Sequence, residues 1–208
     1  MKVLKFGGSS LADAVRYQNV ATIVASIHQT DGAAVVLSAP KGVTNALSLL
    51  TEQAEQGQDF GELQAKLSMT LNSIADELAE AIAGYDITTV KAMIDDTLNY
   101  LDQRLRGIQL LGCAPENTAA ELMSLGEYVS VNLLSHIFKA QGVKNTIIDP
   151  VDYVVANGPY LDALADVAES KARFVDVDNS GDTLLIMPGF VAVNSDGEKV
   201  TLGRNGSD

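Results

Sequence analysis

Apolar residues in the first fifty positions alternate between short unbroken runs and a wider, helical spacing. Residues 3–6 form a short apolar strand, and residues 33–38 form a continuous apolar run that is typical of a strand covered on both faces. Between them, residues 12–27 repeat apolar side chains at the three- and four-residue steps of an amphipathic helix. This order of strand, helix and strand predicts a right-handed βαβ unit.

The middle of the chain has a purely helical period. Residues 60–82 and residues 87–108 each carry one apolar stripe, and a break at Gly84-Tyr85-Asp86 separates them. Two long helices of this kind are expected to pack against each other as an antiparallel hairpin. The stripes could instead serve a partner protein, but packing within the chain is the favoured interpretation.

The last third of the chain returns to alternating elements. Helices are expected over residues 115–139 and 161–174, and strands over residues 146–148 and 184–187. A hairpin is expected around the turn signal Asn194-Ser195-Asp196-Gly197.

The full pattern predicts an α/β fold with a largely parallel sheet flanked by helices, into which the long helical hairpin is inserted. Ligands of such sheets lie at the carboxyl ends of the strands. We therefore expect the loops after Phe6, Ser38 and Leu202 to converge on one site.

The composition is strongly acidic, with a formal net charge of -13. Nucleic acids and anionic membranes both require a basic face, so neither is an expected partner. No apolar run approaches the ~20 residues that span a bilayer. Two histidines and one cysteine predict no metal site, and a single cysteine fits a reducing, cytoplasmic compartment. Because a strand begins at once, no signal peptide is expected.

Two glycine-rich loops stand out against this acidic background. Lys5-Phe6-Gly7-Gly8-Ser9-Ser10 follows the first strand, and Gly203-Arg204-Asn205-Gly206-Ser207-Asp208 stands last in the sequence. The first loop fits neither the P-loop nor the dinucleotide pattern, and a tight turn would explain its glycines. Its lysine favours a ligand, because a cation at a buried strand end needs an anionic partner or water. A phosphate at a helix N-terminus would supply that partner.

Four motifs in order carry a resemblance to a known family. They are Lys5-Phe6-Gly7-Gly8-Ser9-Ser10, Ser38-Ala39-Pro40-Lys41-Gly42-Val43-Thr44-Asn45, Ser124-Leu125-Gly126-Glu127 and Leu202-Gly203-Arg204-Asn205-Gly206-Ser207-Asp208. Together they closely resemble the aspartate kinase branch of the amino acid kinase superfamily, whose fold is a three-layer sandwich. Asn205 resembles the variant found in the kinase moiety of bifunctional aspartokinase–homoserine dehydrogenases.

The resemblance implies transfer of the ATP γ-phosphate, with Mg²⁺, to the side-chain carboxylate of L-aspartate. The product would be 4-phospho-L-aspartate, in the first step of lysine, threonine and methionine biosynthesis. A carboxylate with an unperturbed pKa of about 3.9 is already ionised at neutral pH, so no general base is needed. The protein must instead bring two anions together and neutralise the transferring group.

Roles follow from the resemblance for the phosphate side of the site. Lys5 resembles the catalytic lysine that contacts the ATP phosphates, and Gly7, Gly8 and Ser9 would donate hydrogen bonds to the phosphoryl group. Asp208 would be a second catalytic residue, which orients the lysine or the metal-bound phosphates. A direct protein site for the metal is not expected.

Other residues are expected to bind aspartate. Ser38 and Thr44 would line the pocket, Glu127 would pair with the ammonium group, and Arg204 would grip a carboxylate with its planar fork. The remaining two are Phe190, which would pack on the substrate backbone, and Ser207. Without the resemblance, Glu127 would be taken for a solvated helix residue, Arg204 for a turn residue and Phe190 for core.

The resemblance also implies that adenine and ribose contacts come from sequence beyond these motifs. Residues 1–208 are therefore expected to form the N-terminal, aspartate-binding part of a kinase domain, without its C-terminal nucleotide-binding part. Alone, such a part is expected to be inactive and to associate into a homodimer or higher oligomer through its uncovered sheet. Two alternatives stay open: another amino acid kinase, of the glutamate or acetylglutamate type, or a non-catalytic module for amino-acid binding or oligomerisation.

Overall fold

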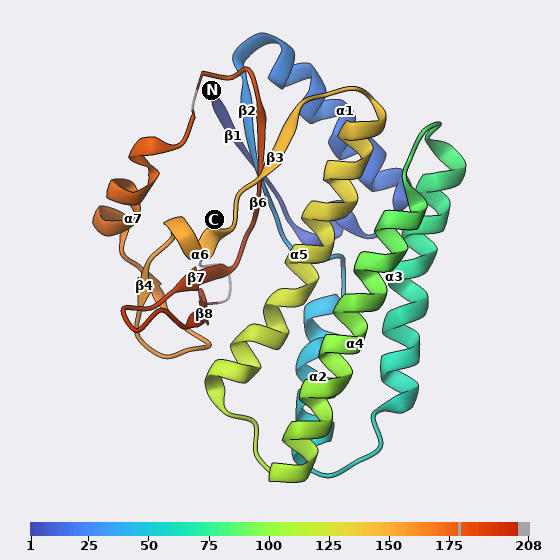
Figure 1. Cartoon of the computed structure of the whole chain (residues 1–208), viewed down its shortest axis with the longest axis vertical. Coiled ribbons are helices and arrows are strands. Elements are labelled where there is room, and N and C mark those ends of the chain that lie inside the picture. Colours follow the sequence, from blue (N-terminus) through green and yellow to red (C-terminus); the bar gives the residue numbers. More distant parts are fainter. Residues whose placement is uncertain (179, 204–208) are drawn as a thin grey trace.

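A four-stranded parallel sheet organises the molecule (Figure 1). The computed structural model describes residues 1–178 and 180–203. The strands are β1 (Lys2–Phe6), β2 (Ala33–Leu37), β6 (Leu184–Pro188) and β3 (Asn145–Ile147), paired in the order β1-β2-β6-β3. Every pair in this sheet is parallel, which confirms the predicted α/β class.

Helices α1 (Ala14–Asp31) and α5 (Glu116–Ala140) pack against one face of this sheet. The buried face of α1 includes Tyr17, Val20 and Val24, which recur at helical spacing. Helix α5 is buried along most of its length and is the central element of the core.

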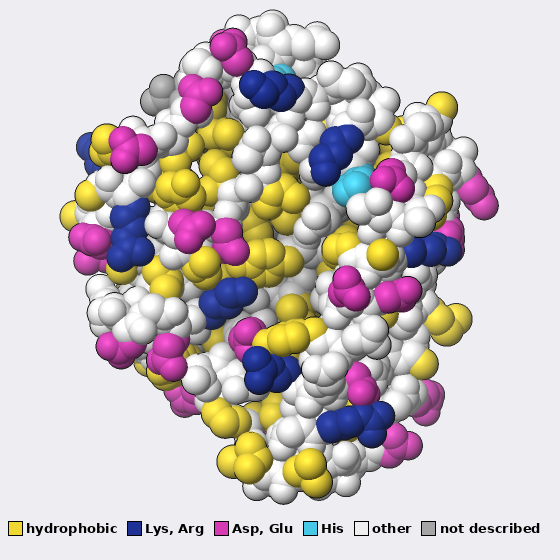
Figure 2. Space-filling model, viewed as in Figure 1, with side chains coloured by type: hydrophobic (Ala, Val, Ile, Leu, Met, Phe, Trp, Pro, Cys, Tyr) yellow, Lys and Arg dark blue, Asp and Glu magenta, His cyan; other side chains and the backbone are white. Residues whose placement is uncertain are grey.

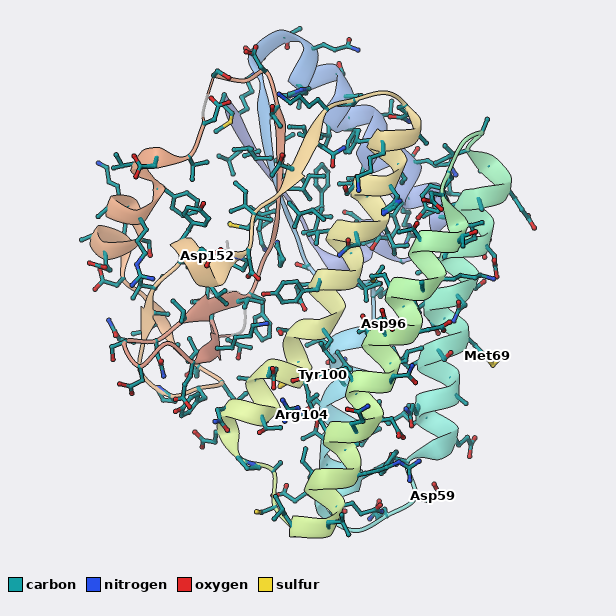
Figure 3. All side chains as sticks on the ribbon, viewed as in Figure 1. Asp59, Met69, Asp96, Tyr100, Arg104 and Asp152 are labelled. Carbon is teal, nitrogen blue, oxygen red and sulfur yellow. The ribbon has the colours of Figure 1, made fainter. Side chains whose placement is uncertain are left out.

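The other long helices form a bundle with the N-terminal half of α5 (Figure 1). They are α2 (Val43–Glu55), α3 (Gly61–Ala81) and α4 (Ile87–Leu111). Helices α3 and α4 pack as the predicted antiparallel hairpin and bury Leu71 and Leu78 on one helix and Ile94 and Leu101 on the other. A polar seam joins α4 to α5, where Arg104 donates to the Tyr100 hydroxyl at 2.9 Å and lies 3.7 Å from the Glu121 carboxylate (Figure 3).

The predicted C-terminal hairpin is present as β7 (Val191–Val193) and β8 (Lys199–Thr201). It packs on a small second core that includes Ala156, Ala163 and Leu202. The remaining elements are α6 (Pro150–Tyr153), β4 (Ala156–Asn157), β5 (Leu164–Ala165), α7 (Val167–Arg173) and the 3₁₀ turns Gly8–Leu11 and Phe174–Asp176.

The helix predicted over residues 161–174 is wrong in its first half. Residues 163–165 are extended, because β5 pairs with β4 and the Ala163 amide donates to the Thr201 carbonyl at 3.0 Å. Asp166 then caps α7 by accepting from the Glu169 amide, and α7 has no buried residue.

The second face of the sheet differs from the prediction that β2 is covered on both sides. It borders an apolar pocket of about 320 Å³, and the Val3 side chain on β1 is 70% exposed. In Figure 2 apolar side chains gather between α7 and the sheet. The pocket is lined by Met1, Val3, Ala34, Val35, Val36, Ile148, Phe174, Val177, Leu185 and Met187. Within the described ranges, no helix combines the length and apolarity needed to cross a bilayer.

Candidate functional site

The loops that follow β1 and β2 meet at the carboxyl edge of the sheet, as predicted. A Cβ atom on Gly8 would lie 2.9 Å from the Ala39 carbonyl oxygen and 3.5 Å from the Cα of Lys41, so only glycine allows this approach. A Cβ atom on Gly7 would meet nothing within 4 Å. Gly8 thus joins the two loops, while Gly7 leaves backbone open on the outer side.

Helix α5 approaches the same loops through Gly126. A Cβ atom there would lie 2.6 Å from the Cβ of Ala39 and 2.9 Å from Cγ1 of Val43. Helix α5 can therefore rest on the loop after β2 only with glycine at this position. The next residue, Glu127, is 3% exposed, so its interpretation as a solvated helix residue is wrong.

The Glu127 carboxyl group is incompletely satisfied. Its Oε2 atom is buried and has no hydrogen-bond partner within the described part of the chain. Burial raises the pKa of Glu127 to about 8, and hydrogen bonding to the backbone of Ala39 and of Glu127 itself lowers it only in part. A buried polar atom without a partner is uncommon, which marks this position as a candidate binding site.

A buried pair of hydroxyl groups lies one turn further along α5, between Ser130 of that helix and Tyr17 of α1. The hydroxyl groups of Tyr17 and Ser130 are 2.8 Å apart, and both side chains are fully buried. Burial raises the pKa of the Tyr17 phenol, with smaller contributions from nearby Tyr85 and Glu127. Sequence reasoning missed this pair, because its partners are 113 positions apart and no local signal connects them.

Phe190 lies next to the strand ends in an unusual backbone conformation. It lies two residues after the end of β6 and has φ = 67°, the only positive φ of a non-glycine residue in the described ranges. Its carbonyl accepts from the Leu202 amide at 2.8 Å, which ties the strand end to the end of the β7–β8 hairpin. Its side chain is half-buried. Such strain is concentrated at functional sites.

The structure brings most of the other predicted residues to this edge. Lys5 is exposed near the end of β1, in register with Val36, and the Ser9 carbonyl accepts from Arg16 at 3.0 Å. Ser38 is half-buried and its amide donates to the Phe6 carbonyl at 3.0 Å, while Thr44 is in the first turn of α2.

Arg204, Ser207 and Asp208 lie outside the described residues. The residues that are described contain no group of three His, Cys, Asp or Glu side chains able to hold a metal ion.

The fold is thus a parallel α/β sheet whose loops after β1 and β2 meet beside a buried acid at its carboxyl edge, where ligands of such sheets lie. A family model described as the amino acid kinase family matches residues 1–208, and the chain belongs to this family.

Relatives within the family are aspartokinases. The chain is 35% identical over 209 residues to a bifunctional aspartokinase/homoserine dehydrogenase of Buchnera aphidicola, with all of this chain and 26% of that protein covered. It is 30% identical over 221 residues to aspartokinase 3 of Bacillus subtilis, of which it covers 44%. The chain therefore spans about a quarter to under half the length of these relatives.

Solved structures agree with the sequence relatives. Aspartokinase III of Escherichia coli in complex with lysine and aspartate matches with a TM-score of 0.84 and 26% identity, over 99% of this chain and 44% of that one. The same enzyme in complex with aspartate and ADP matches with a TM-score of 0.83. The predicted resemblance and fold class are confirmed.

Proposed function

We propose that this chain is the aspartate-binding part of an aspartate kinase that phosphorylates the side-chain carboxylate of L-aspartate. The observation that carries the proposal is Glu127, a buried acid with an unpartnered oxygen under two interlocked loops. An ammonium group would satisfy that oxygen and the charge together. The names of the relatives and the aspartate complexes of Escherichia coli aspartokinase III support aspartate as the ligand.

The remaining residues divide the charges of the reaction between them. Lys5 and the backbone of Gly7, Gly8 and Ser9 would hold the transferring phosphoryl group, and the space beside Gly7 is open. Ser38, Thr44 and Phe190 would position aspartate, and Arg204 and Ser207 would hold its carboxylate. The nucleophile is ionised already, so positioning and charge neutralisation supply the catalysis.

ATP would bring its phosphates and Mg²⁺ to the site and supply the transferable phosphoryl group. The metal would be held mainly by phosphate oxygens, and Asp208 would orient the lysine or the metal-bound phosphates. Nucleotide use is supported by the ADP complex of a structural neighbour.

The setting of the chain is part of the same proposal. A single exposed cysteine, Cys113, fits a cytoplasmic protein. The uncovered apolar face of the sheet favours a homodimer or a higher oligomer of the isolated chain. Relatives with a fused dehydrogenase suggest a bifunctional polypeptide that acts in lysine, threonine and methionine biosynthesis.

The test is binding and turnover in the complete reading frame that contains this chain. Calorimetric titration is made with L-aspartate and with Mg-ATP, and a coupled assay follows ADP release. We expect both ligands to bind, with turnover, and Glu127→Gln to weaken aspartate binding by roughly 2–5 kcal/mol because the ammonium loses its charged partner.

Glu121→Gln is the matched control, since Glu121 lies on the same helix and its ion pair with Arg104 is exposed. Aspartate binding without ATP binding would identify a non-catalytic module instead. Stronger binding of glutamate or acetylglutamate than of aspartate would identify a different amino acid kinase. Equal aspartate affinity in the Glu127 and Glu121 variants would remove Glu127 from the site.

A further inference from the structure

The surroundings of Glu127 provide little stabilisation of an ionised carboxylate. The side chain is 3% exposed, one carboxyl oxygen has no partner, and no Lys or Arg of the described ranges forms an ion pair with it. The close contact of Gly126 with Ala39 and Val43 seals the helix against the loop. A lone carboxylate in such a place is strongly disfavoured.

The groups that pack around Glu127 do not reverse this. From α1, Tyr17 contributes a phenol that is neutral at pH 7 and already bonded to Ser130. On α5 itself, the neighbouring Tyr128 donates its hydroxyl to Asp149 at 2.7 Å, and Lys199 lies 4.5 Å from the centre of the Tyr128 ring.

Four further titratable groups lie on the elements around the site. From the turn before α4, Tyr85 is a buried phenol that stacks edge-on with His136, whose own pKa is lowered by burial. Lys5, near the end of β1, and Lys41, on the loop after β2, are exposed. The charged form of Glu127 is favoured only by hydrogen bonding to the backbone of Ala39 and of Glu127 itself, which carries only partial charges.

We propose that Glu127 waits as a neutral carboxylic acid and that the ammonium group of the amino-acid ligand displaces its proton on binding. This inference rests on the proposed function, because it requires a ligand with an ammonium group at Glu127. The O–H bond of the carboxyl breaks, the proton passes to solvent, and the carboxylate pairs with the incoming ammonium. One positive charge enters as one leaves, so the buried site never holds an unpaired anion.

A pH dependence of affinity follows from this exchange. The free carboxyl has a pKa of about 8, so it is about nine-tenths protonated at pH 7. Ligand binding must then release about 0.9 proton at pH 7. Affinity for L-aspartate should rise nearly tenfold per pH unit between about pH 6 and 7.5 and level off above pH 8.

The experiment is calorimetric titration of the complete polypeptide with L-aspartate at pH 7, in two buffers that differ in ionisation enthalpy. The slope of binding enthalpy against buffer enthalpy counts the protons released. Succinate, which is aspartate without the ammonium group, should bind without releasing a proton. Glu121→Gln should keep the release, and Glu127→Gln, which keeps the shape of the side chain, should abolish it.

The outcomes separate the two proposals. Aspartate binding without proton release would overturn the proposed displacement of the Glu127 proton but leave aspartate recognition intact. Proton release that persists in Glu127→Gln would have the same meaning. Failure of aspartate to bind at all overturns the proposed function as well. If Glu127→Gln binds too weakly to titrate, the comparison of aspartate with succinate on the unaltered protein still decides, since equal release by both ligands contradicts the displacement.

Discussion

Two polar side chains one turn apart on α5 are both buried but differ in their hydrogen bonding. Ser130 is fully buried and meets the Tyr17 hydroxyl at 2.8 Å, so its hydrogen-bonding capacity is used within the chain. Glu127 is 3% exposed and keeps an oxygen without a partner. Ser130 is therefore hydrogen-bonded within the folded chain, whereas the buried carboxyl of Glu127 lowers its stability. Such a destabilising buried group is best explained by a ligand that binds to it.

The largest expected effect concerns the pH dependence of stability at Glu127. Its pKa is raised from 4.5 to about 8 on folding, so between these values the folded chain binds more protons than the unfolded chain. The free energy of unfolding must then fall as pH rises, by about 1.4 kcal/mol per pH unit, and by at most about 4 kcal/mol from pH 5 to pH 8. The stabilisation is complete below pH 4.5 and is lost as pH passes 8.

Glu127→Gln isolates this contribution, because every other titrating group is shared by the two proteins. Urea unfolding at pH 5 and pH 8 should show the Gln variant close to the parent at pH 5 and more stable than it at pH 8. Parallel stability curves for the two proteins would mean that the carboxyl is hydrated or paired, and would end the contrast with Ser130.

A smaller effect is expected from the contact that places Glu127 against the loop. Gly126→Ala puts a methyl group 2.6 Å from the Cβ of Ala39 and should lower the free energy of unfolding by ~1–3 kcal/mol through overpacking. Gly107→Ala on α4 is the matched control, since its added Cβ meets nothing within 4 Å. It should gain ~0.5–1 kcal/mol from helix propensity. Gains of the same size at both positions would show that α5 is not held closely on the loop.

Much of the fold follows from sequence patterns that local physics enforces. The spacing of apolar residues on α3 and α4 predicts both helices and their pairing, because each stripe is buried by the other helix. The error at residues 161–174 has the opposite origin. The helical spacing of the second half of this range faces no core, since α7 has no buried residue, while pairing with β4 and Thr201 keeps residues 163–165 extended.

The site was predictable only through whole motifs. The glycine loops stand out from the residues alone, whereas the role of Glu127 follows only from the resemblance. The structure adds why Gly8 and Gly126 must lack a side chain. No pattern in the sequence could show the unpartnered oxygen of Glu127 or the Tyr17–Ser130 pair, because both depend on how α1, α5 and the loop after β2 pack together. No helix is predicted directly after the strand over residues 146–148, but the structure has the short helix α6 there, capped by Asp149.

The smallest expected effect tests the satisfied side of the comparison. Tyr17→Phe removes one hydroxyl and leaves Ser130 buried without its partner, which should lower the free energy of unfolding by ~1–2 kcal/mol. Tyr100→Phe is the matched control, because the Tyr100 hydroxyl is also hydrogen-bonded, accepting from Arg104, but at the surface of the α4–α5 seam (Figure 3). There water replaces the lost partner, and the loss should stay within ~0.5 kcal/mol. Both variants are compared by urea unfolding at pH 5, where Glu127 is protonated and cannot add its own titration to the difference. If Tyr17→Phe loses no more stability than Tyr100→Phe, the buried hydroxyl pair contributes nothing to the free energy of unfolding. Ser130 would then no longer differ from Glu127 as a polar group that stabilises the fold.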